Sequence, residues 1–107
     1  MAKLPDEFVK RVEDDIEKDV LPNLETMLLS HYPHLEVAYR PTDPESFLFA
    51  YVIGDLEASY HKLFIQEYGL GEYSEDESFA IHRMITVYKE QIMAIVKEFL
   101  KNGLSKN

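Results

Sequence analysis

The spacing of apolar residues predicts a long helix from Ser74 to Lys101. Its apolar positions recur in alternating steps of four and three residues, as they do along one face of an α-helix. This stripe consists of Ile81, Ile85, Tyr88, Ile92, Ile95 and Phe99, bordered by Met84 and Val96. Ser74 and Glu77 have the spacing of an N-terminal capping box, and Gly103 can take the left-handed conformation that ends a helix. We therefore expect one uninterrupted amphipathic helix here.

A second helical pattern opens the chain and changes phase at Pro22. Pro5 suits the first turn of a helix, and the apolar residues after it share one face: Phe8, Val9, Val12, Ile16 and Val20. The next apolar positions lie about 100° round the helix from that face; they are Leu21, Leu24 and Leu28. Proline lacks a backbone donor and its ring clashes with the carbonyl one turn back. We expect this helix to kink or break at Pro22 and its second piece to end near Ser30.

The middle of the chain supports two predictions. Prolines punctuate residues 31–44 as a connection, and Asp43 followed by Pro44 is a strong helix start. The spacing of the apolar residues after it favours one helix from Pro44 to Tyr68; they are Phe49, Ile53, Leu56, Tyr60 and Leu63. The alternative is an α+β fold, because residues 35–40 alternate like a strand and residues 47–53 are aromatic and branched. These two runs would then pair as a short hairpin.

The fold class follows from the way these helices are joined. Residues 69–74 make a short glycine-bearing turn, and short turns between helices place them side by side and antiparallel. We predict an all-α protein, a small antiparallel helical bundle of three long helices forming a single helical domain over residues 1–107, with residues 103–107 as a frayed tail.

Charge and composition narrow the partners. The chain of 107 residues carries a net charge of −9, which repels phosphate backbones and anionic headgroups, so we expect neither nucleic acid nor membrane as a partner. Its longest apolar run, Phe47 to Ile53, is too short to span a bilayer, and the first residues are too polar for a secretory signal. A cytoplasmic location is expected. The acids between Glu13 and Asp19 lack the glycine and final glutamate of a calcium loop, and we interpret them as a solvated helix face.

The chain carries no motif that predicts catalysis. It has no cysteine, no phosphate-binding or dinucleotide-binding glycine pattern, no nucleophile elbow and no zincin motif. These absences favour a protein that is not an enzyme and has no cofactor.

One group of side chains is a candidate metal site. If helices 44–68 and 74–101 are antiparallel, His61 stands level with His82, and Glu57 lies one turn before His61 on the same side. A carboxylate with two imidazoles is a ligand set for zinc or another divalent ion. Both histidines point well away from the facing helix, however, so a pair of surface or core-edge histidines is the simpler interpretation.

A second candidate is an interface on the back of helix 44–68. Ala50, Gly54 and Ala58 are four residues apart and would form a shallow groove that lets another backbone approach closely. We expect apolar residues to border it: Phe47, Tyr51 and Ile65 on the same helix, with Met93 and Leu100 from the last helix. Two coverings of this face stay open, the broken first helix or a second subunit.

Two functions follow from these features. The first is a non-enzymatic, acidic helical interaction module that associates with itself as a homodimer or with a protein partner. The alternative is a small ligand-binding or divalent-metal-binding bundle that uses Glu57, His61 and His82.

Overall fold

The structure, a computed structural model that describes residues 4–103, is built from helices. In chain order they are α1 (Asp6–Asp15), the π-helical turn η1 (Ile16–Val20), α2 (Leu21–Tyr39), α3 (Pro44–Tyr68), the 3₁₀ turn η2 (Leu70–Glu72), α4 (Glu75–Thr86) and α5 (Lys89–Gly103). Residues 4–103 contain no strand, so the all-α class is confirmed and the alternative hairpin of 35–40 with 47–53 is wrong. The tail predicted beyond Gly103 lies outside the described residues.

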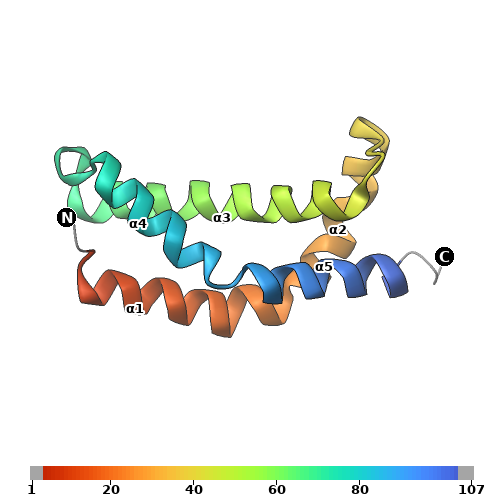
Figure 1. The fold of residues 1–107 in the computed structure, drawn as a ribbon, viewed down its shortest axis with the longest axis horizontal. Coiled ribbons are helices and arrows are strands. Elements are labelled where there is room, and N and C mark those ends of the chain that lie inside the picture. Colours follow the sequence, from red (N-terminus) through yellow and green to blue (C-terminus); the bar gives the residue numbers. More distant parts are fainter. Residues whose placement is uncertain (1–3, 104–107) are drawn as a thin grey trace.

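These helices form three arms that lie side by side (Figure 1). The first arm is α1, η1 and α2, the second is α3, and the third is α4 and α5. Phe8 stacks edge-on against Phe64 while Tyr39 lies against Phe47, so the first arm runs antiparallel to α3. The third arm turns back after η2, and α5 packs against both α2 and α3. The bundle is elongated, measuring 47 × 26 × 20 Å. The arms correspond to the three predicted helices, but the first and third are each divided.

The first arm remains helical through Pro22, with the irregularity placed just before it. The amide of Leu21 bonds to the carbonyl of Ile16, five residues back, instead of four as in an α-helix. This wider turn accommodates a residue that has no N–H and whose ring would clash in an α-turn. A π-turn also contains more residues than an α-turn. The apolar residues after η1 therefore fall on the same face of the arm as those before it. The resulting buried row comprises Phe8, Val12, Ile16, Leu24, Leu28 and Tyr32.

The predicted end of this helix near Ser30 is wrong, and so is the predicted connection over 31–44. α2 continues through Pro33 to Tyr39, where Arg40 adopts a left-handed conformation and its amide caps the helix on Glu36. Tyr32 explains the continuation, because its ring is buried edge-on against Phe99 of α5. Pro33 itself is exposed, so its missing donor costs little in the core.

α3 has the predicted bounds. The Asp43 carboxylate accepts a hydrogen bond from the Ser46 amide at the N-terminus, and Gly69 follows the helix with a φ of 91°. Its buried row differs from the predicted stripe, however, and comprises Leu48, Val52, Leu56, Tyr60 and Phe64. Because an α-helix has 3.6 residues per turn, residues four apart shift gradually round its surface. This row therefore suits a helix that contacts different neighbours along its length. Phe49, Ile53 and Leu63 are therefore only partly buried.

The third arm is not the single helix that was predicted. Its capping box at Ser74 and Glu77 is present, but α4 ends at Thr86 and α5 begins at Lys89. The Thr86 hydroxyl donates to the carbonyl of His82 at 2.8 Å, and the β-branched run Ile85–Val87 further weakens the helix. Across this break Tyr88 remains buried in the core. α5 includes Gly103, which therefore lies inside the helix instead of after it.

Candidate functional site

The small-residue groove of α3 lies on the surface of the bundle. Ala50, Gly54 and Ala58 are all exposed, and a Cβ added to Gly54 would meet no atom within 4 Å. The first arm packs along other sides of α3, as the contacts of Phe64 with Phe8 and of Tyr60 with Asp15 show. Within one chain, this face of α3 has space for another backbone.

One end of the groove opens into an apolar hollow between α2 and α3. The hollow has a volume of about 350 Å³ and is lined by Leu35, Tyr39, Phe47, Ala50 and Tyr51. Tyr39 is 67% exposed although its ring lies against Phe47. Tyr51 is held in place because its hydroxyl is 2.9 Å from Nδ1 of His31. Two of the predicted border residues, Phe47 and Tyr51, thus take part in a defined apolar surface.

The other predicted interface residues do not line the groove or the hollow. Ile65 is half-buried on α3. Met93 and Leu100 are half-buried on α5, where Leu100 packs against the core of the bundle. No contact in the described residues places these two beside the groove. The open groove and the apolar hollow beside it therefore belong to α3 and the end of α2.

His61 and His82 stand level, as the antiparallel arithmetic predicted, and both contact Glu57, although their positions on the two helices were expected to point them apart. Nε2 of His61 lies 3.2 Å from one carboxylate oxygen of Glu57, and Nδ1 of His82 contacts the other oxygen. Both Glu57 and His61 are partly buried, whereas the His82 side chain is 53% exposed. Glu57 therefore bridges a histidine on its own helix to a histidine on α4.

Tyr73 extends this group into a chain of hydrogen bonds that the sequence did not reveal. Its hydroxyl lies 2.5 Å from Nδ1 of His61, and the two rings meet edge-on. A neutral His61 protonated on Nε2 satisfies both neighbours, donating to Glu57 and accepting from Tyr73. Tyr73 follows η2 in the turn between α3 and α4, where no helical period applies.

The convergence does not by itself make a metal centre. Within the described part of the chain, no group of three or more His, Cys, Asp or Glu side chains is placed so that it could hold a metal ion. The carboxylate of Glu57 lies between the two imidazoles and bonds to both of them, so it ties α3 to α4. The three side chains resemble a structural clasp more closely than a ligand set.

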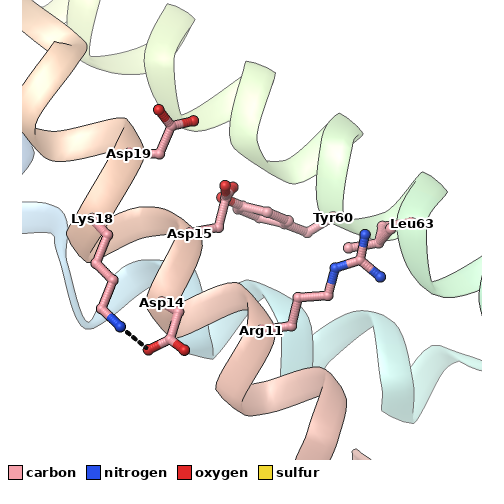
Figure 2. Close-up of a pocket in the computed structure, with 7 residues that line it drawn as sticks. All are labelled: Arg11, Asp14, Asp15, Lys18, Asp19, Tyr60 and Leu63. Carbon is pink, nitrogen blue, oxygen red and sulfur yellow. Dashed lines mark hydrogen bonds and ion pairs between the residues drawn. The ribbon is translucent and has the colours of Figure 1, made fainter.

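A third feature is a polar hollow between the first arm and α3 (Figure 2). It has a volume of about 390 Å³ and is lined by Arg11, Asp14, Asp15, Lys18, Asp19, Tyr60 and Leu63. The Tyr60 hydroxyl donates to Asp15 at 2.5 Å, and Lys18 lies 3.7 Å from Asp14. Arg11 turns toward α3 and pairs with Glu67.

Four of the five acids between Glu13 and Asp19 are exposed, in agreement with the interpretation of a solvated face, but two of them also accept hydrogen bonds from other arms. Burial, the bond to Asp15 and nearby carboxylates together raise the pKa of Tyr60 far above its ordinary value. Tyr88 donates to Glu17 at 2.6 Å, and its pKa is also raised, first by burial and then by that bond. Tyr68 donates to Glu7 at 3.1 Å. Three acids of the first arm thus accept hydrogen bonds from other arms.

Comparisons with known proteins supply no further evidence about the site, since no family model, curated protein or solved structure matches the chain. Among residues 4–103, no helix combines the length and apolar character needed to cross a membrane.

Proposed function

We propose that the protein is a non-enzymatic interaction module that pairs with a second copy of itself through the exposed face of α3. The observation that carries this proposal is the open space over Ala50, Gly54 and Ala58. Small residues allow two helix backbones to approach closely, and they lose little side-chain entropy when they are covered. A two-fold contact of α3 with its symmetry mate would use the same groove on both copies.

The adjoining apolar hollow supports the proposal. A partner of complementary shape would bury this exposed apolar surface. Its aromatic side chains, Tyr39, Phe47 and Tyr51, are rigid and of the kind enriched in interfaces. In the proposed dimer they flank the small-residue contact.

Charge also favours this end of the molecule for self-association. Two copies that each carry −9 repel one another through most of their surface. Residues 29–42, which include the exposed half of α2, contain one acid, Glu36, and one base, Arg40. This nearly neutral stretch lies beside the start of the α3 face, so it adds little repulsion to a contact there.

The proposal is tested by Gly54→Leu, with Ala94→Leu as the matched control. Both variants add bulk at an exposed helical position, but Ala94 lies on α5. Gly54→Leu should convert a dimer to a monomer in sedimentation while helicity by circular dichroism is kept, because the added side chain has open space in one copy. Ala94→Leu should remain dimeric. Equal sedimentation of wild type and Gly54→Leu as dimers would contradict the proposal.

The alternative of a divalent-metal-binding bundle has one supporting observation, the convergence of Glu57, His61 and His82. It requires His82 to leave its hydrogen bond and present Nδ1 to the ion. Zinc added at one equivalent should then raise the melting temperature of wild type and leave that of His82→Ala unchanged. Equal effects on the two proteins would remove this alternative.

A further inference from the structure

The irregular points of the first and third arms lie at the same level of the bundle. η1 interrupts the first arm, and residues Val87–Tyr88 interrupt the third. The Tyr88 hydroxyl joins them directly by donating to Glu17 in η1 at 2.6 Å. Figure 1 shows the junction of α4 and α5 beside the junction of α1 and α2. We call this level the waist.

α3 is continuous through the waist, but it carries a glycine there, Gly54. Asp15 accepts from Tyr60, and a hollow of about 180 Å³ is lined by Asp19 and Val20 of η1 together with Val52, Asp55 and Leu56. Val52, Leu56 and Tyr60 of α3 therefore face the first arm around η1. Gly54 lies at the same level of α3 but on its exposed side. A glycine inside a helix is less favourable than alanine, because its backbone loses more conformational freedom. No neighbour requires the absence of a side chain there within one chain.

A single hydrophobic core runs through all three arms, and the specific polar and aromatic contacts lie in two groups, one on either side of the waist. We call the two sides of the bundle its lobes. At one end Arg11 pairs with Glu67 and His82 contacts Glu57, which joins α1 and α4 to the second half of α3. At the other end α2 and α5 join the first half of α3. The contacts of that second lobe are His31 with Tyr51, Tyr32 with Phe99, and Lys97 with Glu45.

We propose that the bundle bends at the waist, as two lobes joined by η1, by the helical turn around Gly54 and by the Val87–Tyr88 break. The hydrogen bond from Tyr88 to Glu17 limits the bend, because it ties the two interrupted arms to one another. Sharp changes of helix axis occur at π-helical turns and where the i→i−4 hydrogen-bond ladder is interrupted, and the first and third arms each carry one of these features at the waist. The two hollows that share Asp19 lie between η1 and α3, so the bend alters their width.

Distances between spin labels test the bend directly. The chain has no cysteine, so pairs of introduced cysteines are the sole labelling sites. Lys10→Cys with Ser30→Cys spans the waist, and Lys10→Cys with Gln66→Cys lies within one lobe; all three positions are exposed. Dilution with unlabelled wild type keeps each measured pair within one chain. A change of about 20° in axis direction moves a label about 10 Å from the axis by roughly 3 Å.

The expected result is a broader distance distribution for the pair that spans the waist than for the pair within one lobe. Tyr88→Phe should broaden or shift the first distribution further and leave the second unchanged. Tyr68→Phe is the matched control, because it removes a tyrosine–glutamate bond within one lobe, and it should change neither. Glu17→Ala removes the exposed acceptor of the same hydrogen bond and should have the same effect as Tyr88→Phe. It tests the proposal independently if the Tyr88 variant folds poorly.

Two results would overturn the proposal. One is a distribution across the waist that is as narrow as the one within a lobe and that does not respond to Tyr88→Phe or Glu17→Ala. The other is an equal response to Tyr68→Phe, which would show that any lost tyrosine bond loosens the whole bundle.

Discussion

The two faces of α3 differ in their burial. One face carries the buried row from Leu48 to Phe64, in which each side chain is at most 5% exposed. The opposite face carries Ala50, Gly54 and Ala58, which are exposed with open space above Gly54. Both faces are apolar or small in the sequence, so hydrophobicity alone does not separate them. The difference shows that the large side chains of α3 fill the core, whereas its small ones leave an open face.

The largest effect is expected from truncation on the buried face. Phe64→Ala removes a ring that is 3% exposed and that contacts Phe8 and Tyr68. Such a change should lower the free energy of unfolding by about 3–5 kcal/mol, through lost burial and a cavity. Denaturant unfolding measures it. A loss below about 1 kcal/mol would mean that the first arm does not pack on α3 as described.

Alkaline pH tests the tyrosine bonds beside the buried face. The pKa values of Tyr60 and Tyr88 are raised in the folded chain, so their contribution to stability is complete below the unfolded pKa of about 10 and is lost as pH rises through the folded values. The free energy of unfolding should therefore fall above about pH 10. Tyr60→Phe should make that fall less steep. An identical alkaline profile in wild type and Tyr60→Phe would contradict the buried hydrogen bond.

The open face predicts the opposite sign for a substitution at its centre. Gly54→Ala should raise the free energy of unfolding by about 1 kcal/mol, because alanine is the better helix former and its Cβ meets no atom within 4 Å in one chain. Thermal or urea unfolding at micromolar concentration measures the gain. Marked destabilisation would show that the groove is filled by another part of the chain.

The smallest effect is expected at the histidine clasp, on the border between the two faces. His82→Ala removes a hydrogen bond from α4 to Glu57 and should cost about 0.5–1.5 kcal/mol. Arg83→Ala, at the neighbouring exposed position, is the control and should change stability by less. Equal losses in the two variants would show that Glu57 does not hold α4.

The parts of the fold that could be predicted from the sequence are those set by local chemistry. α3 was placed from Pro44 to Tyr68 because Asp43 and Gly69 mark its ends within a few residues. Antiparallel register then predicted that His61 stands level with His82 and on the side of Glu57. That both histidines contact Glu57 was not predicted, because their positions on the helices point away from the facing helix.

The wrong predictions of helix boundaries have two kinds of cause, a distant contact and a local hydrogen bond. Pro33 indicated a connection, but burial of Tyr32 against Phe99 keeps α2 helical. The break after Thr86 has the opposite cause, because one hydroxyl bonding back to His82 competes with the helix while the apolar spacing continues unchanged. Tyr73 could not be placed from periodicity, since it lies in a turn.

Sedimentation of the wild-type protein tests the central claim, that α3 pairs with its symmetry mate, most directly. The proposal predicts a dimer at about 100 μM, where dimers with micromolar dissociation constants are populated. It also predicts a larger dimer fraction when salt is raised from about 0.05 M to 0.5 M, because screening reduces repulsion between two chains of charge −9. A protein that sediments as a monomer at about 100 μM in both salts would contradict the claim.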